Sequence, residues 1–219
     1  MKLAVVVPVL NEGAALQLRL QALAPLRARG AWVVLVDGGS TDGTCATAQP
    51  LCDAVRVAPR GRAAQMNAGA VAAAQAGADV LLFLHADTQL PPDADRLIEA
   101  ALARGAAWGR FDVRIQGMHP LLPMVAAFMN LRSRLSGIAT GDQALFVRRR
   151  VFEALGGFAP LPLMEDIDLS ARLKRCSPPA CVAQRVTTAG RRWDQHGLWR
   201  TMVLMWRLRA AYAAGADPY

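Results

Sequence analysis

A continuous apolar run from Val80 to Leu84 ends directly on His85 and Asp87. Such a run, without the polar alternation of a half-exposed strand, is typical of a strand buried on both faces of a parallel sheet. Because ligands of open α/β sheets bind at the carboxyl ends of the strands, the run predicts a core strand that carries a His-x-Asp into an active site. The alternative is that Asp87 and Thr88 only start a turn ahead of two prolines.

Strand-like and helix-like segments alternate through the first half of the chain. Helical patterns separate three further apolar runs that precede the one at 80–84, namely Lys2 to Leu10, Trp32 to Val36 and Val55 to Ala58. This α/β alternation predicts a parallel sheet covered by helices. The second half is less regular, with predicted strands at 107–115 and 143–147 and predicted helices at 164–173 and 198–214.

The composition fits one globular domain with a C-terminal extension. The 219 residues are 53% hydrophobic and 19% charged, a balance that argues against a disordered chain. The net charge of +8 favours an anionic partner, either a phosphorylated ligand or a membrane surface. The arginines are dispersed, without a basic block or interleaved aromatic residues, so we expect no nucleic acid partner.

We expect a cytoplasmic protein without a signal peptide or a membrane-spanning segment. Pro8, Asn11 and Glu12 interrupt the first apolar run, and no stretch reaches the roughly 18 apolar residues that a bilayer requires. The four cysteines form neither a Cys-x-x-Cys nor a zinc-type spacing, which indicates free thiols of a reducing compartment. A Cys176–Cys181 disulfide is the alternative.

Acidic or amide side chains recur at the predicted strand ends. The set comprises Asn11 with Glu12, Asp37 with Asp42, His85 with Asp87, and Glu165 and Asp166 with Asp168. A nucleoside diphosphate needs such a mixture, because one carboxylate accepts hydrogen bonds from ribose or base and another holds a divalent cation against the phosphates. Arg60 and Arg62 would contact the base or a phosphate. The alternatives are a plain glycine-rich turn at 38–43 and a solvated loop at 60–62.

Six motifs together resemble those of family 2 glycosyltransferases with the GT-A fold. They are Val7-Pro-Val-Leu-Asn-Glu12, Val36-Asp-Gly-Gly-Ser-Thr-Asp-Gly-Thr44, Gly61-Arg-Ala-Ala-Gln-Met-Asn67, Leu84-His-Ala-Asp-Thr88, Thr140-Gly-Asp-Gln143 and Met164-Glu-Asp-Ile-Asp168. The fourth and sixth motifs are most similar to those of a compact bacterial subgroup. The resemblance implies a single Rossmann-like, mostly parallel central sheet flanked by helices.

The resemblance also implies an organisation into a catalytic domain and an extension. The domain would cover 1–190, with a nucleotide-binding half over about 1–90 and an acceptor half over about 91–190. A helical extension over 191–219 would pack on the domain or at an interface.

The same resemblance implies a pocket for a nucleoside-diphosphate sugar, such as a UDP- or GDP-sugar. The implied donor-binding residues are Pro8, Asn11, Glu12, Asp37, Arg62, Asn67 and Asp87. Asp87 and His85 are the implied ligands of Mg²⁺ or Mn²⁺, which would stabilise the leaving nucleoside diphosphate. The implied acceptor or diphosphate region comprises Gly141, Asp142, Gln143, Asp168, Arg192 and Trp193.

Asp166 stands where inverting members of the family place the general base. There it would deprotonate the acceptor hydroxyl as that oxygen attacks the anomeric carbon of the sugar. Glu165 or Asp168 is the competing base. The plainer alternative for all three is a helix N-terminus, where acidic side chains interact favourably with the helix dipole.

Two positions depart from the family pattern. His85 replaces the first Asp of the Asp-x-Asp motif, which leaves the metal preference open. Ala189 stands where processive synthases carry the Gln of a Gln-x-x-Arg-Trp motif, although Arg192 and Trp193 match its last two residues. Together with the absence of a transmembrane channel, this argues against processive polymer synthesis.

The apolar C-terminal segment over 198–209 admits two interpretations. Its larger residues fall largely on one side of a helix, namely Leu198, Trp199, Met202, Met205, Trp206 and Leu208. We favour a helix that packs on the core or forms a homodimer. The alternative is an interfacial helix on an anionic membrane, at the inner face, with a lipid-linked acceptor. The apolar run Leu121 to Met129 is either core or a wall for such an acceptor.

The sequence therefore predicts a metal-dependent, inverting glycosyltransferase of the hexosyltransferase type. A nucleotidyltransferase is the rival enzyme, but it would need a lysine-bearing phosphate loop, and the only early lysine is Lys2. A non-catalytic nucleotide-sugar-binding protein is the rival from another class, with His85 marking lost metal binding. Asp87 and Asp166 argue against that rival.

Overall fold

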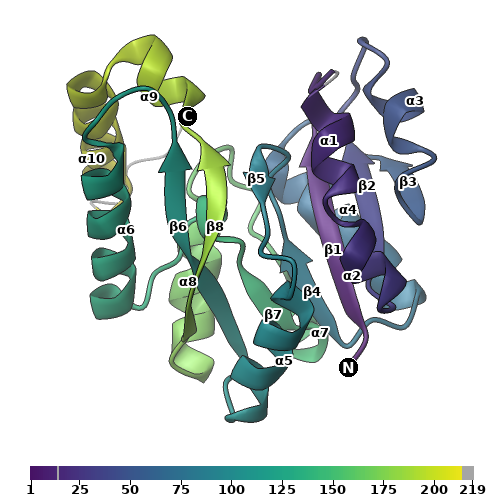
Figure 1. Cartoon of the computed structure of the whole chain (residues 1–219). Coiled ribbons are helices and arrows are strands. Elements are labelled where there is room, and N and C mark those ends of the chain that lie inside the picture. The colour runs from purple at the N-terminus through teal and green to yellow at the C-terminus, as the bar shows by residue number, and fades with distance from the viewer. Residues whose placement is uncertain (14, 214–219) are drawn as a thin grey trace.

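One eight-stranded sheet forms the centre of the computed structural model, which describes residues 1–13 and 15–213 but not the side chains of Arg192, His196 and Ala213. The strands lie in the order β3-β2-β1-β4-β7-β6-β8-β5 (Figure 1). The first half consists of parallel strands, namely β1 (Leu3–Val9), β2 (Trp32–Asp37), β3 (Ala54–Val57) and β4 (Val80–Phe83). All of β4 is buried, which confirms the predicted core strand.

Helices cover both faces of the sheet, because each turns apolar residues toward it. One face carries α1 (Ala15–Gln21), α2 (Ala24–Ala28), α3 (Thr44–Ala48) and α5 (Ala94–Ala103), and the other carries α4 (Arg62–Gln75), α7 (Arg149–Ala154) and α8 (Glu165–Cys176). At Gly69 of α4, an added Cβ would lie 2.3 Å from a methyl of Val6. Glycine therefore lets α4 approach the sheet closely.

The second half of the sheet is mixed rather than parallel. Its strands are β6 (Trp108–Gln116), β7 (Phe146–Arg148), β8 (Ala180–Ala189) and the two-residue β5 (Thr88–Gln89). β7 runs antiparallel to both β4 and β6, whereas β8 runs parallel to β6. β5 pairs Thr88 with Thr188 and so ties the segment after β4 to the far edge of the sheet.

Two predictions for this half need correction. The strand predicted at 143–147 is divided, because Gly141–Gln143 form the short 3₁₀ helix η1 and the strand begins only at Phe146. Strand β8 was not predicted, since its residues alternate irregularly between buried and exposed. A register shift between Phe111 and Asp112 of the neighbouring β6 accompanies that irregularity.

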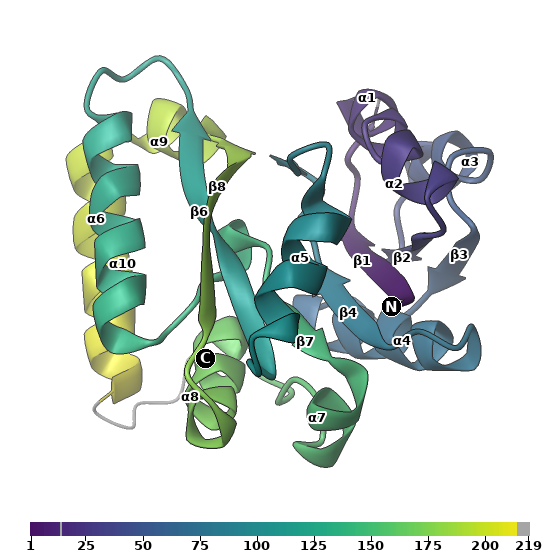
Figure 2. The same ribbon diagram turned by 60° about the horizontal axis from the view of Figure 1, so that its bottom comes forward.

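Three further helices form the outer layer beside β6 and β8. They are α6 (Leu122–Ser136), α9 (Arg191–His196) and α10 (Leu198–Ala213), and α6 and α10 lie together on the side remote from β1–β3 (Figure 2). Leu198 and Thr201 of α10 are buried. Trp199 and Trp206 are exposed, so these two residues of the predicted apolar side do not pack on the core of this chain. The predicted domain boundary at residue 190 stays a prediction.

The described residues also bear on membrane spanning and on disulfides. None of the helices in the described part of the chain combines the length and hydropathy needed to cross a membrane. Cys45, Cys52, Cys176 and Cys181 are free thiols, so the alternative of a Cys176–Cys181 bridge is wrong.

Candidate functional site

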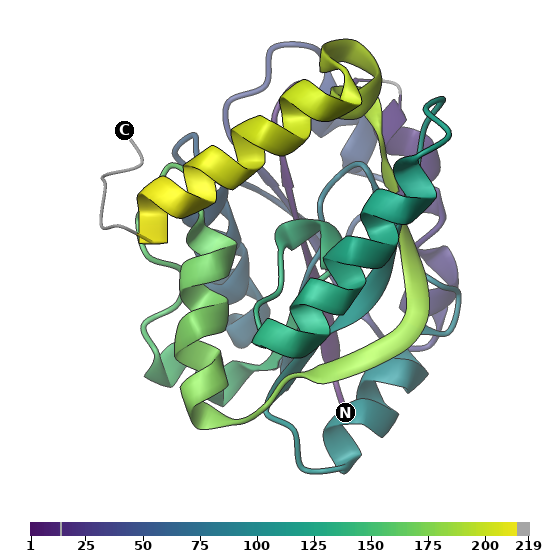
Figure 3. The same cartoon turned by 90° about the vertical axis from the view of Figure 1, so that its left-hand side faces the viewer.

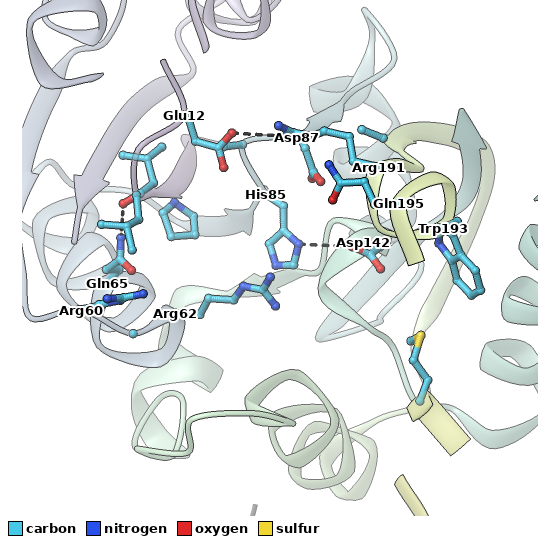
Figure 4. Close-up of a pocket in the computed structure, with 17 residues that line it drawn as sticks. Glu12, Arg60, Arg62, Gln65, His85, Asp87, Asp142, Arg191, Trp193 and Gln195 are labelled. Carbon is cyan, nitrogen blue, oxygen red and sulfur yellow. Dashed lines mark hydrogen bonds and ion pairs between the residues drawn. The ribbon is translucent and has the colours of Figure 1, made fainter. Parts of the chain in front are cut away.

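A cavity of about 620 Å³ lies at the carboxyl ends of β1 and β4, between the start of α4 and the helices α9 and α10 (Figure 4). Its lining mixes carboxylates with guanidinium groups and little apolar surface. The residues that line it are Pro8, Val9, Leu10, Glu12, Arg60, Gly61, Arg62, Gln65, His85, Ala86, Asp87, Asp142, Ala189, Arg191, Trp193, Gln195 and Met205. Seven of the residues predicted for the donor, metal or acceptor sites lie in this wall: Pro8, Glu12, Arg62, His85, Asp87, Asp142 and Trp193.

The loop after β2 is held by its own carboxylates. Asp37 Oδ2 accepts hydrogen bonds from the amides of Gly39 and Ser40, both at 2.9 Å, and the Ser40 hydroxyl donates to Asp37 Oδ1. Burial by itself would raise the pKa of Asp37, but these hydrogen bonds outweigh it and hold the pKa below its ordinary value. Asp37 is buried behind the cavity wall, so the structure places it as a support of the loop.

The loops after β1 and β2 hold each other in place. The Asn11 amide donates to Ser40 Oγ at 2.8 Å, and Asn11 Oδ1 accepts from the Thr41 amide at 2.9 Å. Asn11 adopts a left-handed backbone with φ of 52°. Asn11 itself is not one of the residues that line the cavity. Its observed contacts instead orient the turn that presents Glu12.

Gln65 is a cavity residue that the sequence reasoning missed. Its buried side-chain amide donates to the carbonyls of Val9 at 2.7 Å and Val36 at 2.8 Å. Val9 is the last residue of β1, and Val36 is the last but one of β2. An added Cβ on Gly38 would lie 3.1 Å from this amide. Gln65 therefore fixes the spacing of the two strand ends. The only sequence signal was its place one turn after Arg62 in the third motif.

Asn67 lies away from the cavity. Its side chain donates to the carbonyl of Phe158 and accepts from the Phe158 amide, both at 2.9 Å. These two hydrogen bonds tie α4 to the loop ahead of α8. These contacts give Asn67 a structural role. Arg60 and Arg62, just before and at the start of the same helix, line the cavity.

His85 and Asp87 come from the end of β4, as predicted, but they make different contacts. His85 Nδ1 lies 3.4 Å from Asp142 Oδ1, and an added Cβ on Gly141 would lie only 2.2 Å from the His85 ring. Asp87 Oδ1 accepts hydrogen bonds from the hydroxyls of Thr88 at 3.3 Å and Thr188 at 3.4 Å. The ring is thus packed on η1, while the Asp87 carboxylate is oriented by β5 and β8.

The carboxylates of the cavity fit a metal ion whose remaining ligands come from the substrate. Within residues 1–13 and 15–213, no three side chains of the His, Cys, Asp or Glu type gather as a metal cluster. Mg²⁺ is commonly bound through one or two carboxylates, with substrate phosphates and waters supplying the other ligands. Asp87 and Asp142 line the same cavity and supply that number.

Three carboxylates at the start of α8 have three different surroundings. Asp166 Oδ2 accepts from the Gly141 amide at 2.7 Å, and its Oδ1 accepts from the Ile167 amide at 2.7 Å. Asp168 forms an ion pair with Arg172 at 2.6 Å. Glu165 is buried, and that burial together with the Asp166 carboxylate raises its pKa above the ordinary value.

The residues of η1 have divided roles. Thr140 and Gln143 are placed as in a capping box, in which the Gln143 side-chain oxygen accepts a hydrogen bond from the Thr140 amide at 3.2 Å. Gln143 is fully buried and also donates to Asn130 Oδ1 at 3.4 Å. Asp142, between them, faces the cavity. The capping box therefore fixes the turn that links Asp142 of the cavity to the Gly141 amide held by Asp166.

Two half-buried arginines lie near Asp166, and the sequence reasoning missed both. Nε and Nη2 of Arg132 on α6 are buried without a hydrogen-bond partner in the described structure. Burial and, to a smaller extent, the nearby Arg209 lower the pKa of Arg132 to about 10, whereas Asp166 opposes the shift. Burial likewise lowers the pKa of Arg209, against Asp166 and Asp142. No local pattern in the sequence marks these two arginines as buried.

Helices α9 and α10 close the cavity on the side opposite the sheet ends. Arg191 Nη2 lies 3.4 Å from Glu12 Oε2 across the cavity mouth (Figure 4). Trp193 lines the wall as predicted, and it is joined by Gln195 and Met205, which the sequence reasoning missed. The predicted side chain of Arg192 lies outside the described residues.

A comparison with protein families finds one matching family model. The model described as "Glycosyl transferase family 2" matches residues 4–156. A curated relative is the succinoglycan biosynthesis protein ExoA of Rhizobium meliloti (strain 1021), which is 39% identical over 188 residues. That match covers 77% of this chain and 57% of the relative, so the chain spans little more than half of the relative's length.

Solved structures confirm the GT-A fold. The 1–349 fragment of S. aureus TarS has a TM-score of 0.66 at 17% identity, covering 86% of this chain and 60% of that one. The mannosyltransferase PcManGT of Pyrobaculum calidifontis, solved with GDP-Man and Mn²⁺, has a TM-score of 0.63 at 20% identity. Its match covers 96% of this chain and 61% of that one. At this low identity, the likeness is one of fold.

Proposed function

Because the chain belongs to glycosyl transferase family 2, we propose that it transfers a sugar from a nucleoside-diphosphate donor to a hydroxyl acceptor, with inversion at the anomeric carbon. The observation that carries this proposal is the shared cavity at the ends of β1 and β4, in which Arg60 and Arg62 face carboxylates across one space. A UDP-GlcNAc complex of TarS and the GDP-Man complex of PcManGT support a nucleotide-sugar donor.

The donor would lie along the ends of β1 and β4. Pro8 and Glu12 would contact the nucleoside, because they form the wall at the end of β1. Arg60 and Arg62 would bind the diphosphate through charge-assisted hydrogen bonds. Arg191 would hold the mouth closed through its ion pair with Glu12.

Asp87 and Asp142 would hold a divalent cation, and His85 would orient Asp142. A bound Mg²⁺ or Mn²⁺ would supply charge neutralisation of the leaving diphosphate. Complexes of glucosyl-3-phosphoglycerate synthase from Mycobacterium tuberculosis contain Mg²⁺ or Mn²⁺ together with UDP, which supports a cation of this kind.

Asp166 would act as the general base. Of the three carboxylates, Asp168 is engaged by Arg172, and Glu165 is buried with a raised pKa. Asp166 accepts hydrogen bonds from two backbone amides, which orient its carboxylate. It would accept the proton of the acceptor hydroxyl as that oxygen bonds to the anomeric carbon and the diphosphate leaves.

The first test is a screen of UDP- and GDP-sugars for thermal stabilisation of the protein, with and without Mg²⁺ or Mn²⁺. We expect at least one nucleotide sugar to raise the melting temperature only when a cation is present. Hydrolysis of that sugar in the absence of an acceptor would then report on catalysis. The proposal would be overturned if no nucleotide sugar stabilised the protein and the protein hydrolysed none of them.

A further inference from the structure

Helices α6 and α10 carry large apolar side chains that no part of the described chain covers. The two helices form the outer layer of the molecule next to each other (Figure 3). The exposed apolar residues on them are Met124, Phe128, Leu131 and Leu135 of α6, and Trp199, Val203, Leu204 and Trp206 of α10. We call these eight residues the apolar face. Leu135 is 79% exposed and Trp199 67%, so they do not belong to the core.

The apolar face accompanies an uneven distribution of charge. α6 and α10 together contain five arginines, at 132, 134, 200, 207 and 209, and no aspartate or glutamate. Arg200 and Arg207 are exposed on α10 beside the two tryptophans. A helix that combines tryptophan and leucine with arginines in this way is typical of helices that lie in the interface of an anionic bilayer.

A second copy of the chain fits this surface less well. A symmetric contact through α10 would bring Arg200 and Arg207 of two molecules together, and neither helix offers an acid to receive them. Arg134 of α6 is already paired with Asp112 at 2.7 Å. Phospholipid headgroups, in contrast, would supply the negative charge that both helices lack.

We propose that the apolar face of α6 and α10, with Arg200 and Arg207, docks the protein on the surface of an anionic lipid bilayer. The helices would lie on the bilayer rather than cross it, because none of the described helices is long and apolar enough to span a membrane. The inward side of α10 places Met205 in the cavity wall. Docking would therefore leave only α10 between the lipid and this wall of the candidate site.

This position narrows the acceptor class, a step that rests on the proposed function. Arg132 has buried, unpartnered nitrogens, and it also lines a hollow on α6 walled by Phe128, Leu131 and Leu135. A cation between apolar walls suits an acceptor whose anionic group is attached to a lipid chain. The docking proposal itself needs only vesicles, so its failure would leave the proposed transfer untouched.

The test is sedimentation of the purified protein with vesicles of phosphatidylcholine, with and without phosphatidylglycerol. We expect binding only to the phosphatidylglycerol vesicles, with a blue shift in tryptophan emission as the two exposed indoles leave water. The double variant Trp199→Ser/Trp206→Ser should bind on the order of a hundredfold more weakly. The double variant Arg200→Ala/Arg207→Ala should bind about thirtyfold more weakly, and the loss should shrink in high salt.

Matched variants on other surfaces control for a general loss of apolar area or charge. Leu18→Ser/Val57→Ser removes two residues that are 74% and 75% exposed on the far side of the sheet. Arg96→Ala/Arg104→Ala removes two exposed charges at α5. Both controls should bind vesicles as the unmodified protein does, and circular dichroism should show equal helix content in all variants.

Three outcomes would overturn the docking proposal. The first is no binding of the unmodified protein to phosphatidylglycerol vesicles, and the second is equal binding by the tryptophan variant. The third is a concentration-dependent dimer in light scattering that the tryptophan variant abolishes, which would assign the apolar face to a second copy.

Discussion

The two halves of the molecule differ in whether their charged side chains have partners. In the half built on β1 to β4, carboxylates are satisfied by near neighbours: Asp37 by the amides of its own loop, and Asp53 by Arg27 at 2.7 Å. In the half built on β6 to β8, Arg132 has buried nitrogens without a partner, and Glu165 is buried beside another carboxylate. Both halves share one sheet.

The difference separates a rigid binding region from a reactive one. Hydrogen bonds within a loop fix its shape before a ligand arrives, which lowers the cost of binding. Buried charge without a full set of partners lowers stability, and it concentrates where proteins bind or react with charged groups. We therefore expect substitutions in the first half to change stability and donor affinity, and substitutions around Asp166 to change turnover.

The largest expected effect is that of Asp166→Asn. The amide cannot accept the acceptor proton, so transfer should fall by about 10²–10⁴-fold. Donor binding, measured by thermal shift, should be retained, because Asp166 lies outside the wall of the donor cavity. Transfer at the unmodified rate would remove Asp166 as the base and shift attention to Glu165.

Asp87→Ala should come next. Loss of the carboxylate that we propose as a ligand of the cation should weaken metal-dependent donor binding about 10–100-fold, as is typical of changes around metal ligands. The readout is the Mg²⁺ or Mn²⁺ concentration needed for half-maximal thermal stabilisation by the donor. Asp93→Ala, at an exposed position before α5, is the matched control. An unchanged metal requirement would contradict the assignment of Asp87.

Arg132→Met tests whether the unpartnered nitrogens of Arg132 lower the stability of the second half. Removing a buried, unpartnered guanidinium should raise the free energy of unfolding by about 1–3 kcal/mol in urea titrations. Arg134→Met, two residues along the same helix, should lower stability instead, because it leaves Asp112 without one of its partners. Equal changes in the free energy of unfolding for the two variants would contradict the difference that we describe between the halves.

Asp37→Asn tests the opposite expectation for the first half. It weakens the hydrogen bonds to Gly39 and Ser40 and should destabilise the fold by about 1–2 kcal/mol. Since the folded pKa of Asp37 lies below its unfolded value, its contribution is present above the unfolded pKa and is lost as the pH falls through the folded pKa. Unfolding of the unmodified protein and the variant should therefore converge in acid. A constant difference at all pH values would exclude the ionised carboxylate as the cause.

Glu165→Gln should produce the smallest change. The folded pKa of Glu165 is raised by burial and by Asp166, so the folded state binds this proton more tightly than the unfolded state does. The unmodified protein should lose stability as the pH rises from the unfolded pKa through the folded one. The variant should be more stable at neutral pH and equal in acid.

The first half of the fold could be predicted because its signals are local. A strand buried on both faces reads as an apolar run, and β1, β2 and β4 all have that form. His85 and Asp87 follow directly from the end of such a run. β8 escaped prediction because its burial depends on β6, β5 and α5 rather than on its own alternation.

The sequence by itself determined the α/β alternation, the strand-end carboxylates and the family of this chain. Tertiary structure alone decided that Asp37 and Asn67 support loops, that Gln65 joins two strand ends, and that α10 turns Trp199 and Trp206 outward. It also brought Arg132 and Arg209 toward Asp166 from helices far apart in the chain. The physical reason is that burial and charge pairing are properties of the neighbours a side chain meets, and those neighbours come from distant segments.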